Sequence, residues 1–383
     1  HGADAFGSTG DEYGFVRQIM HLGPGGECYG LNLSPGAANN CAHRARKKAN
    51  HRGRYDSAIQ KRRPEIAMDA DEKQTAAEQI AIIGAGSIGR AFALVFASAG
   101  YQVRLSEAAA SVRKEALDRI AASIADLRAF DLCEGDADAI ISRISVSGDL
   151  GETVRDASYV QDCVPEDLGL TRKKFRDLES LAPESAVLAS SSSAIQASQI
   201  ATGLETARRC LVAHPGNPPT LIRVIEVVPA PFTGADFVER ACRTLRSAGL
   251  APVVVRKEVA GFVFNRLQGA VLREAYCLVR DGIAGVEDID TIVRDGLGLR
   301  WSVVGPFETA DLNRRGGIAA HARIMGAAYE SMGVERGQHD PWTPELVAKV
   351  EAERRALLPL DDWDDRVRWR DREIMKLLAC RQD

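Results

Sequence analysis

His214 and Glu226 are the residues whose types and spacing point most directly to acid–base chemistry. His214 ends an apolar run and is followed by Pro-Gly-Asn-Pro-Pro, which predicts a strand that gives way to a rigid loop. Glu226 interrupts a second apolar run, residues 222–228, where an unpaired carboxylate would be costly. We therefore expect Glu226 to have a partner, with His214 as the functional candidate and Arg223 as the local one.

A His–Glu pair would supply what the oxidation of an alcohol needs. The imidazole accepts the hydroxyl proton while hydride leaves the carbon, and the carboxylate fixes the tautomer of the ring and stabilises the imidazolium. The competing interpretation is a histidine that serves only the packing of the fold. The residue types alone leave both interpretations open.

A glycine-rich turn follows the first apolar run of strand length, residues 80–83. The pattern GxGxxG predicts that Gly84 allows a tight turn, Gly86 lets a pyrophosphate approach the backbone, and Gly89 lets the next helix pack closely. The start of that helix would present free N–H groups to the phosphates. The predicted dinucleotide site comprises Gly84, Gly86, Ser87, Ile88 and Gly89.

Glu107 ends the second predicted strand, residues 102–107, roughly 20 residues after the first glycine of the turn. A carboxylate there accepts hydrogen bonds from the adenosine ribose and would repel a 2′-phosphate. No arginine follows within residues 108–112 to bind such a phosphate, so we expect NAD rather than NADP. A solvated strand end is the competing interpretation for Glu107.

The elements that must position these residues alternate between strand-like and helix-like segments from about 77 to 258. The later apolar runs are residues 140–146, 159–164, 186–189 and 210–213. Such alternation indicates parallel βαβ units and an α/β fold with a doubly wound (Rossmann) sheet. From about 259 to 383 helical periodicity dominates, which predicts an all-α C-terminal domain.

Residues 1–76 are rich in Gly, Asn, Arg and His and lack sustained periodicity. Such a segment cannot bury enough apolar area to offset its ordering entropy, so we expect a disordered or non-native extension over 1–67, ahead of Met68. Its basic run at 43–54 would suit a nucleic-acid tail, an interpretation we rank lower. Five possible metal ligands fit no standard zinc spacing: His21, Cys28, Cys41, His43 and His51.

The bulk composition excludes several classes of function. The net charge of −4 over 383 residues offers no positive field for nucleic acid, and no apolar run is long enough to span a bilayer. The eight cysteines include no CxxC pair and are typical of reduced, cytoplasmic thiols. We expect a small-molecule substrate, with no nucleic-acid, membrane or metal partner.

These segments together resemble the 3-hydroxyacyl-CoA dehydrogenase superfamily, and within it the lambda-crystallin and L-gulonate 3-dehydrogenase branch. The resemblance runs from about 79 to 380. Its carrying motifs are IAIIGAGSIGRAFALVFASAGYQVRLSE, VQDCVPEDL, LASSSSAI, VAHPGNPP, IRVIEVVP, KEVAGFVFNRLQ and DGLGLRWSVVGPFETADLN. It implies a C-terminal domain like that of 6-phosphogluconate dehydrogenase, and by analogy a homodimer.

The resemblance also implies roles for individual residues. His214 matches the catalytic base and Glu226 its partner, while Ser193 matches the serine that hydrogen-bonds the reacting oxygen. Asn265 matches the asparagine that positions substrate, and Glu166 of VPED belongs to the cofactor site. The competing interpretations are that Ser193 only stabilises a turn and that Asn265 only caps a helix.

Two departures from the family pattern stand out. The family usually has SNTS or SSTS where residues 190–193 are all serine, which is a mild change. Thr171 stands where relatives commonly have lysine, and the loss of that cation is expected to weaken contacts with cofactor or substrate.

The loop after His214 bears on the substrate. Acyl-CoA members of the superfamily usually read His-Phe-Phe-Asn-Pro, whereas this chain has His-Pro-Gly-Asn-Pro-Pro, as in the gulonate and carnitine branch. A free hydroxy acid carries a carboxylate, and Arg300 is the candidate to bind it, against the alternative of a surface arginine at a helix end.

We therefore expect NAD-dependent oxidation of the 3-hydroxyl of a small hydroxy acid to the 3-keto acid, as in an L-gulonate 3-dehydrogenase. The alternatives are a carnitine 3-dehydrogenase, a 3-hydroxybutyryl-CoA dehydrogenase and, in another class, a crystallin-like structural protein. The intact set of His214, Glu226, Ser193 and Asn265 argues against a loss of activity.

Overall fold

The computed structural model describes residues 78–130, 132–337, 343–367 and 369. The chain divides into two units, residues 1–74 and 75–383. Our predictions for residues 1–76, including the basic run and the possible metal ligands, lie outside the described residues.

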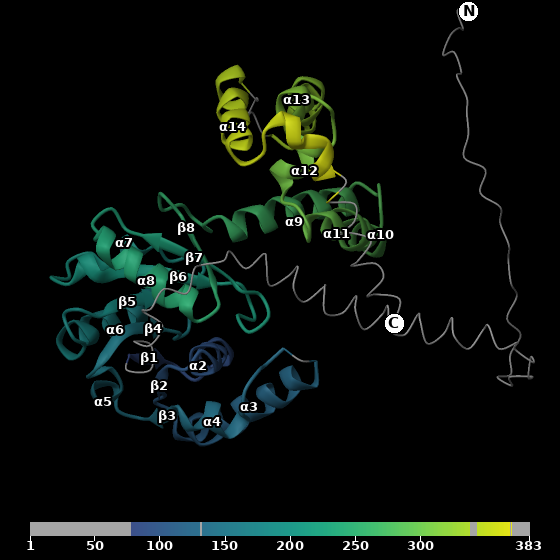
Figure 1. Ribbon diagram of the computed structural model, residues 1–383. Coiled ribbons are helices and arrows are strands. Elements are labelled where there is room, and N and C mark those ends of the chain that lie inside the picture. Colours follow the sequence, from purple (N-terminus) through teal and green to yellow (C-terminus); the bar gives the residue numbers. More distant parts are fainter. Residues whose placement is uncertain (1–77, 131, 338–342, 368, 370–383) are drawn as a thin grey trace, which may run out of the picture. The chain divides into compact units, whose positions relative to one another are not determined.

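A single eight-stranded sheet of order β3-β2-β1-β4-β5-β6-β7-β8 organises the first half of the described chain (Figure 1). Its strands are β1 (Gln79–Ile83), β2 (Gln102–Ser106), β3 (Ile144–Ser147), β4 (Ala157–Asp162), β5 (Val187–Ser190), β6 (Cys210–Pro215), β7 (Val224–Pro229) and β8 (Ala251–Val254). The order reverses between β1 and β4, which is where ligands bind in doubly wound sheets.

Helices cover both faces of this sheet because alternate strand residues point to opposite sides. Ile80 and Ile82 of β1 belong to one apolar core, and Ala81 and Ile83 belong to the other. The helices of this region are α2 (Ser87–Ser98), α3 (Ala110–Ala129), α4 (Ala137–Ser142), α5 (Leu150–Val154), α6 (Leu168–Leu181), α7 (Ala197–Ala201) and α8 (Ala235–Ser247), with a 3-10 turn at Ala207–Arg209. The predicted α/β doubly wound class is confirmed.

Two local expectations need correction, and one strand was not predicted. The apolar run 140–146 is not one strand: it ends α4, and β3 begins at Ile144. Strand β7 runs antiparallel to β6 because the loop between them is too short for a helical crossover. Strand β8, which pairs parallel with β7, was missed because four residues carry too little periodicity.

The C-terminal region is helical, as predicted. Its elements are α9 (Phe264–Arg280), α10 (Val286–Thr291), a π-helical turn (Ile292–Leu297), α11 (Gly298–Trp301), α12 (Pro306–Leu312), α13 (Gly317–Glu335), α14 (Pro344–Leu357) and a 3-10 turn (Leu360–Asp362). The fully buried carboxylate of Asp311 joins three of these helices, since it accepts from the Ile318 N–H and pairs with Arg354 and Arg355. No helix of the described chain is long and apolar enough to cross a membrane.

A buried acid ends β4. Asp162 is 2% exposed, and its carboxyl receives one long hydrogen bond, from the Val164 N–H at 3.4 Å. Burial raises the pKa of Asp162 to about 7, while that hydrogen bond and the positive charge of Lys174 pull it down only in part. The folded protein therefore holds a proton here that the unfolded chain releases at lower pH.

The substitution Asp162→Asn tests this. Between about pH 4 and pH 7 the folded state binds more protons than the unfolded state, so the free energy of unfolding must fall as the pH rises. From pH 5 to pH 8 we expect the native protein to lose about 2–3 kcal/mol relative to the Asn variant, measured by urea denaturation. Asp118→Asn, on the exposed side of α3, serves as the control. Parallel pH profiles for Asp162→Asn and the native protein would contradict the prediction.

Candidate active site

His214 and Glu226 face each other across the antiparallel pair β6–β7. They are direct register partners, and Nδ1 of His214 lies 2.8 Å from Oε2 of Glu226. Side chains directly opposite each other in such a pair lie on the same face of the sheet, so the strand register itself creates the contact. Both side chains are buried. With the carboxylate as acceptor, Nδ1 is the donor in this contact, and in the neutral ring Nε2 is the nitrogen that can accept a proton.

The second carboxylate oxygen of Glu226 binds the entrance of α9. Oε1 accepts from the backbone N–H groups of Val263 at 2.7 Å and Phe264 at 3.0 Å. The first N–H groups of a helix have no partner within the helix, so the carboxylate satisfies donors that would otherwise be orphaned. Glu226 is therefore held from two directions, by the imidazole and by the start of the C-terminal region.

An unusual backbone turn presents these N–H groups. Phe262 has a positive φ of 46° although it is fully buried and not a glycine, and it follows Gly261 at 75°. A bulky residue in this region costs about 1–3 kcal/mol, and such strain gathers at functional sites. The rings of Phe262 and Phe264 lie 5.8 and 6.3 Å from the imidazole, centroid to centroid. Sequence reasoning missed this turn; the glycine that opens Gly-Phe-Val-Phe-Asn was its signal.

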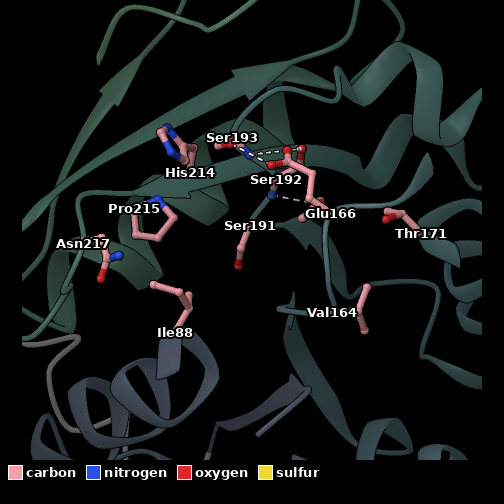
Figure 2. Close-up of a pocket in the computed structure, with 11 residues that line it drawn as sticks. Ile88, Val164, Glu166, Thr171, Ser191, Ser192, Ser193, His214, Pro215 and Asn217 are labelled. Atoms are coloured by element: carbon pink, nitrogen blue, oxygen red, sulfur yellow. Dashed lines mark hydrogen bonds between the residues drawn. The ribbon is translucent and has the colours of Figure 1, made fainter. Parts of the chain in front are cut away.

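Glu166, which follows β4, is hydrogen-bonded to the serine loop, residues 191–194, that follows β5. Its carboxylate accepts from the hydroxyls of Ser192 and Ser193 and from the N–H groups of Ser193 and Ala194 (Figure 2). Burial alone would raise the pKa of Glu166, but these hydrogen bonds hold it below its usual value. Asn265 joins the same loop, because its Nδ2 donates to the Ser193 carbonyl at 3.3 Å.

These residues surround one pocket at the carboxyl ends of β4, β5 and β6, next to the start of α2. It is lined by Ile88, Val164, Glu166, Thr171, Ser190, Ser191, Ser192, Ser193, His214, Pro215 and Asn217 (Figure 2). Four predicted site residues are in this lining, and Glu226 and Asn265 contact it through His214 and Ser193. Arg300, on α11, does not line it. Asn217 and Ser191 do, although sequence reasoning assigned them no role.

A buried hydrogen-bond chain fixes Ser191. Tyr159 donates from its hydroxyl to Oε1 of Gln161 at 2.6 Å, and Nε2 of Gln161 donates to Ser191 Oγ at 2.7 Å and to the Ala213 carbonyl at 3.2 Å. A carbonyl only accepts, so the orientation of the Gln161 amide is determined. The Ser191 oxygen therefore accepts, and its own proton is available to the Cys163 sulfur at 3.2 Å or to a molecule in the pocket.

The glycine-rich turn has the shape that a dinucleotide requires. A Cβ on Gly89 would lie 1.8 Å from the Gly84 carbonyl oxygen, and Gly84 itself has a φ of 96°. By contrast, a Cβ on Gly86 would meet no atom within 4 Å, so bare backbone faces open space at the start of the twelve-residue helix α2. Glu107 follows β2, and its carboxylate accepts from the N–H groups of Ala85 and Ala109, each at 2.9 Å. These residues fit a dinucleotide whose pyrophosphate lies over Gly86.

No group of three or more side chains suited to hold a metal ion occurs in the part of the chain that the structure describes. The carboxylate of Glu166, which lines the pocket, is instead hydrogen-bonded to Ser192 and Ser193.

Comparison with known proteins identifies the family. Residues 79–259 match the NAD binding domain of 3-hydroxyacyl-CoA dehydrogenase, and residues 261–357 match its C-terminal domain. The chain therefore belongs to the 3-hydroxyacyl-CoA dehydrogenase family and is an NAD-dependent oxidoreductase that acts on a CH–OH group.

Individual relatives add detail. The chain is 41% identical to lambda-crystallin of Oryctolagus cuniculus over 243 residues, which cover 63% of this chain and 76% of the relative. It is 36% identical to an L-carnitine dehydrogenase of Streptomyces coelicolor over 273 residues, covering 70% and 82%. Among solved structures, 5-formyl-3-hydroxy-2-methylpyridine 4-carboxylic acid 5-dehydrogenase is similar, with a TM-score of 0.59 at 28% identity, covering 74% of this chain and 97% of that one.

A matched pair of glycine substitutions separates the folding of the turn from its binding of NAD. Gly86→Ala should leave the free energy of unfolding within about 1 kcal/mol of the native value, because the added methyl meets no protein atom. It should nevertheless weaken NADH binding more than roughly tenfold, since the methyl occupies the place of the pyrophosphate. Gly89→Ala should lower the free energy of unfolding as well, because its methyl collides with backbone. Urea denaturation and NADH fluorescence titration measure the two effects, and native NADH affinity in Gly86→Ala would refute the assignment.

Proposed function

We propose that this enzyme oxidises the 3-hydroxyl of a small free hydroxy acid to the 3-keto acid, as an L-gulonate 3-dehydrogenase does. The observation that carries the proposal is the buried contact of His214 with Glu226 beside a pocket that begins at the glycine-rich turn. In the neutral imidazole the carboxylate fixes the proton on Nδ1, so Nε2 is the atom of His214 that would take a hydroxyl proton.

We assign the roles of the site residues from the family resemblance and from their places around the pocket. His214 removes the proton from the substrate hydroxyl, and Glu226 stabilises the imidazolium that results. Bound NAD supplies the acceptor for the hydride that leaves the same carbon. Ser193 and Asn265 orient the reacting oxygen through neutral groups, which add no charge beside the forming imidazolium. Glu166 holds the serine loop and is our candidate for a contact with the cofactor.

One observation supports a free acid over a CoA thioester, because the loop after His214 has Pro-Gly in place of the Phe-Phe common in acyl-CoA members. The relatives include both an L-carnitine dehydrogenase and a 3-hydroxyacyl-CoA dehydrogenase. Arg300 is our candidate for the carboxylate. Its Nε is buried without a hydrogen-bond partner among the described residues, although the side chain does not line the pocket.

A substrate panel tests the proposal. NADH formation is measured with L-gulonate, L-carnitine, 3-hydroxybutyrate and 3-hydroxybutyryl-CoA, and we expect the highest kcat/KM with L-gulonate. His214→Ala and Glu226→Gln should each lower kcat by roughly 10³–10⁴-fold, because the first removes the base and the second favours the wrong tautomer. NADH affinity, the internal control, should stay native in both variants. Preference for the CoA thioester would overturn the substrate class, and no NADH from any substrate would favour a crystallin-like role.

We also propose that the chain forms a homodimer through α9. This helix buries none of its residues, yet its apolar side chains Leu267, Val271, Leu272 and Tyr276 are all exposed in the single chain. An apolar face of this extent marks an interaction surface.

The five described cysteines are free thiols, which supports the cytoplasmic location expected from the sequence.

Light scattering after gel filtration checks the dimer. The native chain of 41.4 kDa should elute at twice that mass, and Leu267→Lys combined with Val271→Lys should convert it to a monomer. Arg273→Glu, which changes the charge at an exposed position on the opposite side of the same helix, should leave the dimer intact. A monomeric native protein would refute the proposal.

A further inference from the structure

The carboxylate of Glu107 occupies a place that would suit another anion. Oε2 accepts from the Ala85 N–H and Oε1 from the Ala109 N–H, each at 2.9 Å. Both donors belong to the backbone, one from the glycine-rich turn and one from the segment before α3. They would remain in place with any side chain at position 107, so the fold itself builds a small anion seat beside the adenosine end of the cofactor site.

A cation lies next to this seat. Nη1 of Arg113, in the first turn of α3, donates to the carbonyl oxygens of Glu107 at 2.7 Å and Ala108 at 2.8 Å. The guanidinium lies flat against Gly148, where an added Cβ would come within 3.0 Å of Nη1 and 3.1 Å of the central carbon. The first turn of α3 thus brings Arg113 back toward Glu107, which follows β2. Arg113 lies one position beyond residues 108–112, the segment in which we would expect an arginine for NADP.

Arg113 has unused binding capacity. A guanidinium carries five N–H donors, of which the two on Nη1 are engaged here. Those on Nε and Nη2 have no hydrogen-bond partner within the described ranges, and Arg113 forms no ion pair there. The two carbonyl groups fix its orientation without neutralising its charge. A fork of this kind is the side chain best suited to bind a phosphate through two parallel hydrogen bonds.

We propose that Arg113, with the N–H groups of Ala85 and Ala109, forms a latent binding site for the 2′-phosphate of NADP, which Glu107 fills with its own carboxylate. Glu107 would then exclude NADP by charge repulsion and by occupying the two donors. The proposal concerns dinucleotide binding alone, so it does not depend on which hydroxy acid is oxidised.

The test measures the dissociation constants of NADH and NADPH by fluorescence titration of the full chain without substrate. The native protein should bind NADPH at least roughly 100-fold more weakly than NADH, because the 2′-phosphate meets the carboxylate. Glu107→Ser should strengthen NADPH binding by at least about tenfold, and should weaken NADH binding because the ribose hydroxyls lose an acceptor.

The role of Arg113 is isolated in the Glu107→Ser background. Adding Arg113→Ala should cancel most of the gain in NADPH affinity and change NADH affinity by less than about threefold. Arg113→Gln, which keeps part of the stem packing, should behave like the alanine variant. The matched control is Lys114→Ala, which removes the same charge one residue further on, at an exposed position, and should change neither affinity.

Several results would overturn the proposal. One is a Glu107→Ser variant, folded by its thermal transition, that gains no NADPH affinity. Another is an Arg113→Ala effect that is equal for NADH and NADPH, which would make Arg113 a structural support of the strand end. If the native chain bound neither dinucleotide, the cofactor site itself would fail, and that outcome is distinct from a failure of the hydroxy-acid assignment in the substrate panel.

Discussion

The rest of the site depends on one buried carboxylate, that of Glu226. It is 3% exposed and receives hydrogen bonds from an imidazole on the neighbouring strand and from two N–H groups at the start of α9. Removing a charge from water costs several kcal/mol, so the side chain is tolerated only because all three donors converge on it. Those donors come from β6 and from the entrance to the helical region. One group therefore fixes the ring of His214 and also joins the two parts of the described chain.

The reversal of β7 makes this convergence possible. In a parallel pair the hydrogen bonds are slanted, and the next strand would be reached only by a long crossover. The short antiparallel connection instead brings Glu226 directly opposite His214, at the end of the sheet where the glycine-rich turn and the serine loop also lie. The pocket is therefore formed by strand ends and loops in which Glu166 holds the serine loop and Glu226 holds His214.

Sequence reasoning succeeded where the constraint is local. The strand, the three glycines and the following helix at 80–98 are adjacent in the chain. The structure shows a steric requirement for Gly84 and Gly89 and open space beside Gly86. A carboxylate within an apolar strand likewise indicates that a partner is needed. Of the two candidates, His214 and Arg223, the structure shows His214 hydrogen-bonded to Glu226. The family motifs extended this to Ser193, Asn265 and Glu166, whose positions around the pocket follow from the fold.

The features that sequence reasoning missed depend on backbone groups or on distant contacts. The N–H groups of Val263 and Phe264 carry no signature in the residue types, so their bonds to Glu226 could not be foreseen. The chain from Tyr159 through Gln161 to Ser191 requires the pairing of β4 with β5, and Arg113 reaches Glu107 only because a helical turn folds it back. The break at Ile144 was hidden because the end of α4 and the start of β3 are both apolar.

The left-handed backbone at Phe262 constrains how this protein can evolve. A glycine would adopt that conformation without strain, so replacing the phenylalanine would relieve the backbone. The same change would delete a fully buried ring that packs beside the imidazole of His214, and would leave a void in the second apolar core. The backbone at position 262 thus favours glycine, whereas the packing of the core requires phenylalanine. Substitutions at position 262 therefore either keep the backbone strain or lose the buried ring. A tolerated substitution would require a different backbone path at the start of α9.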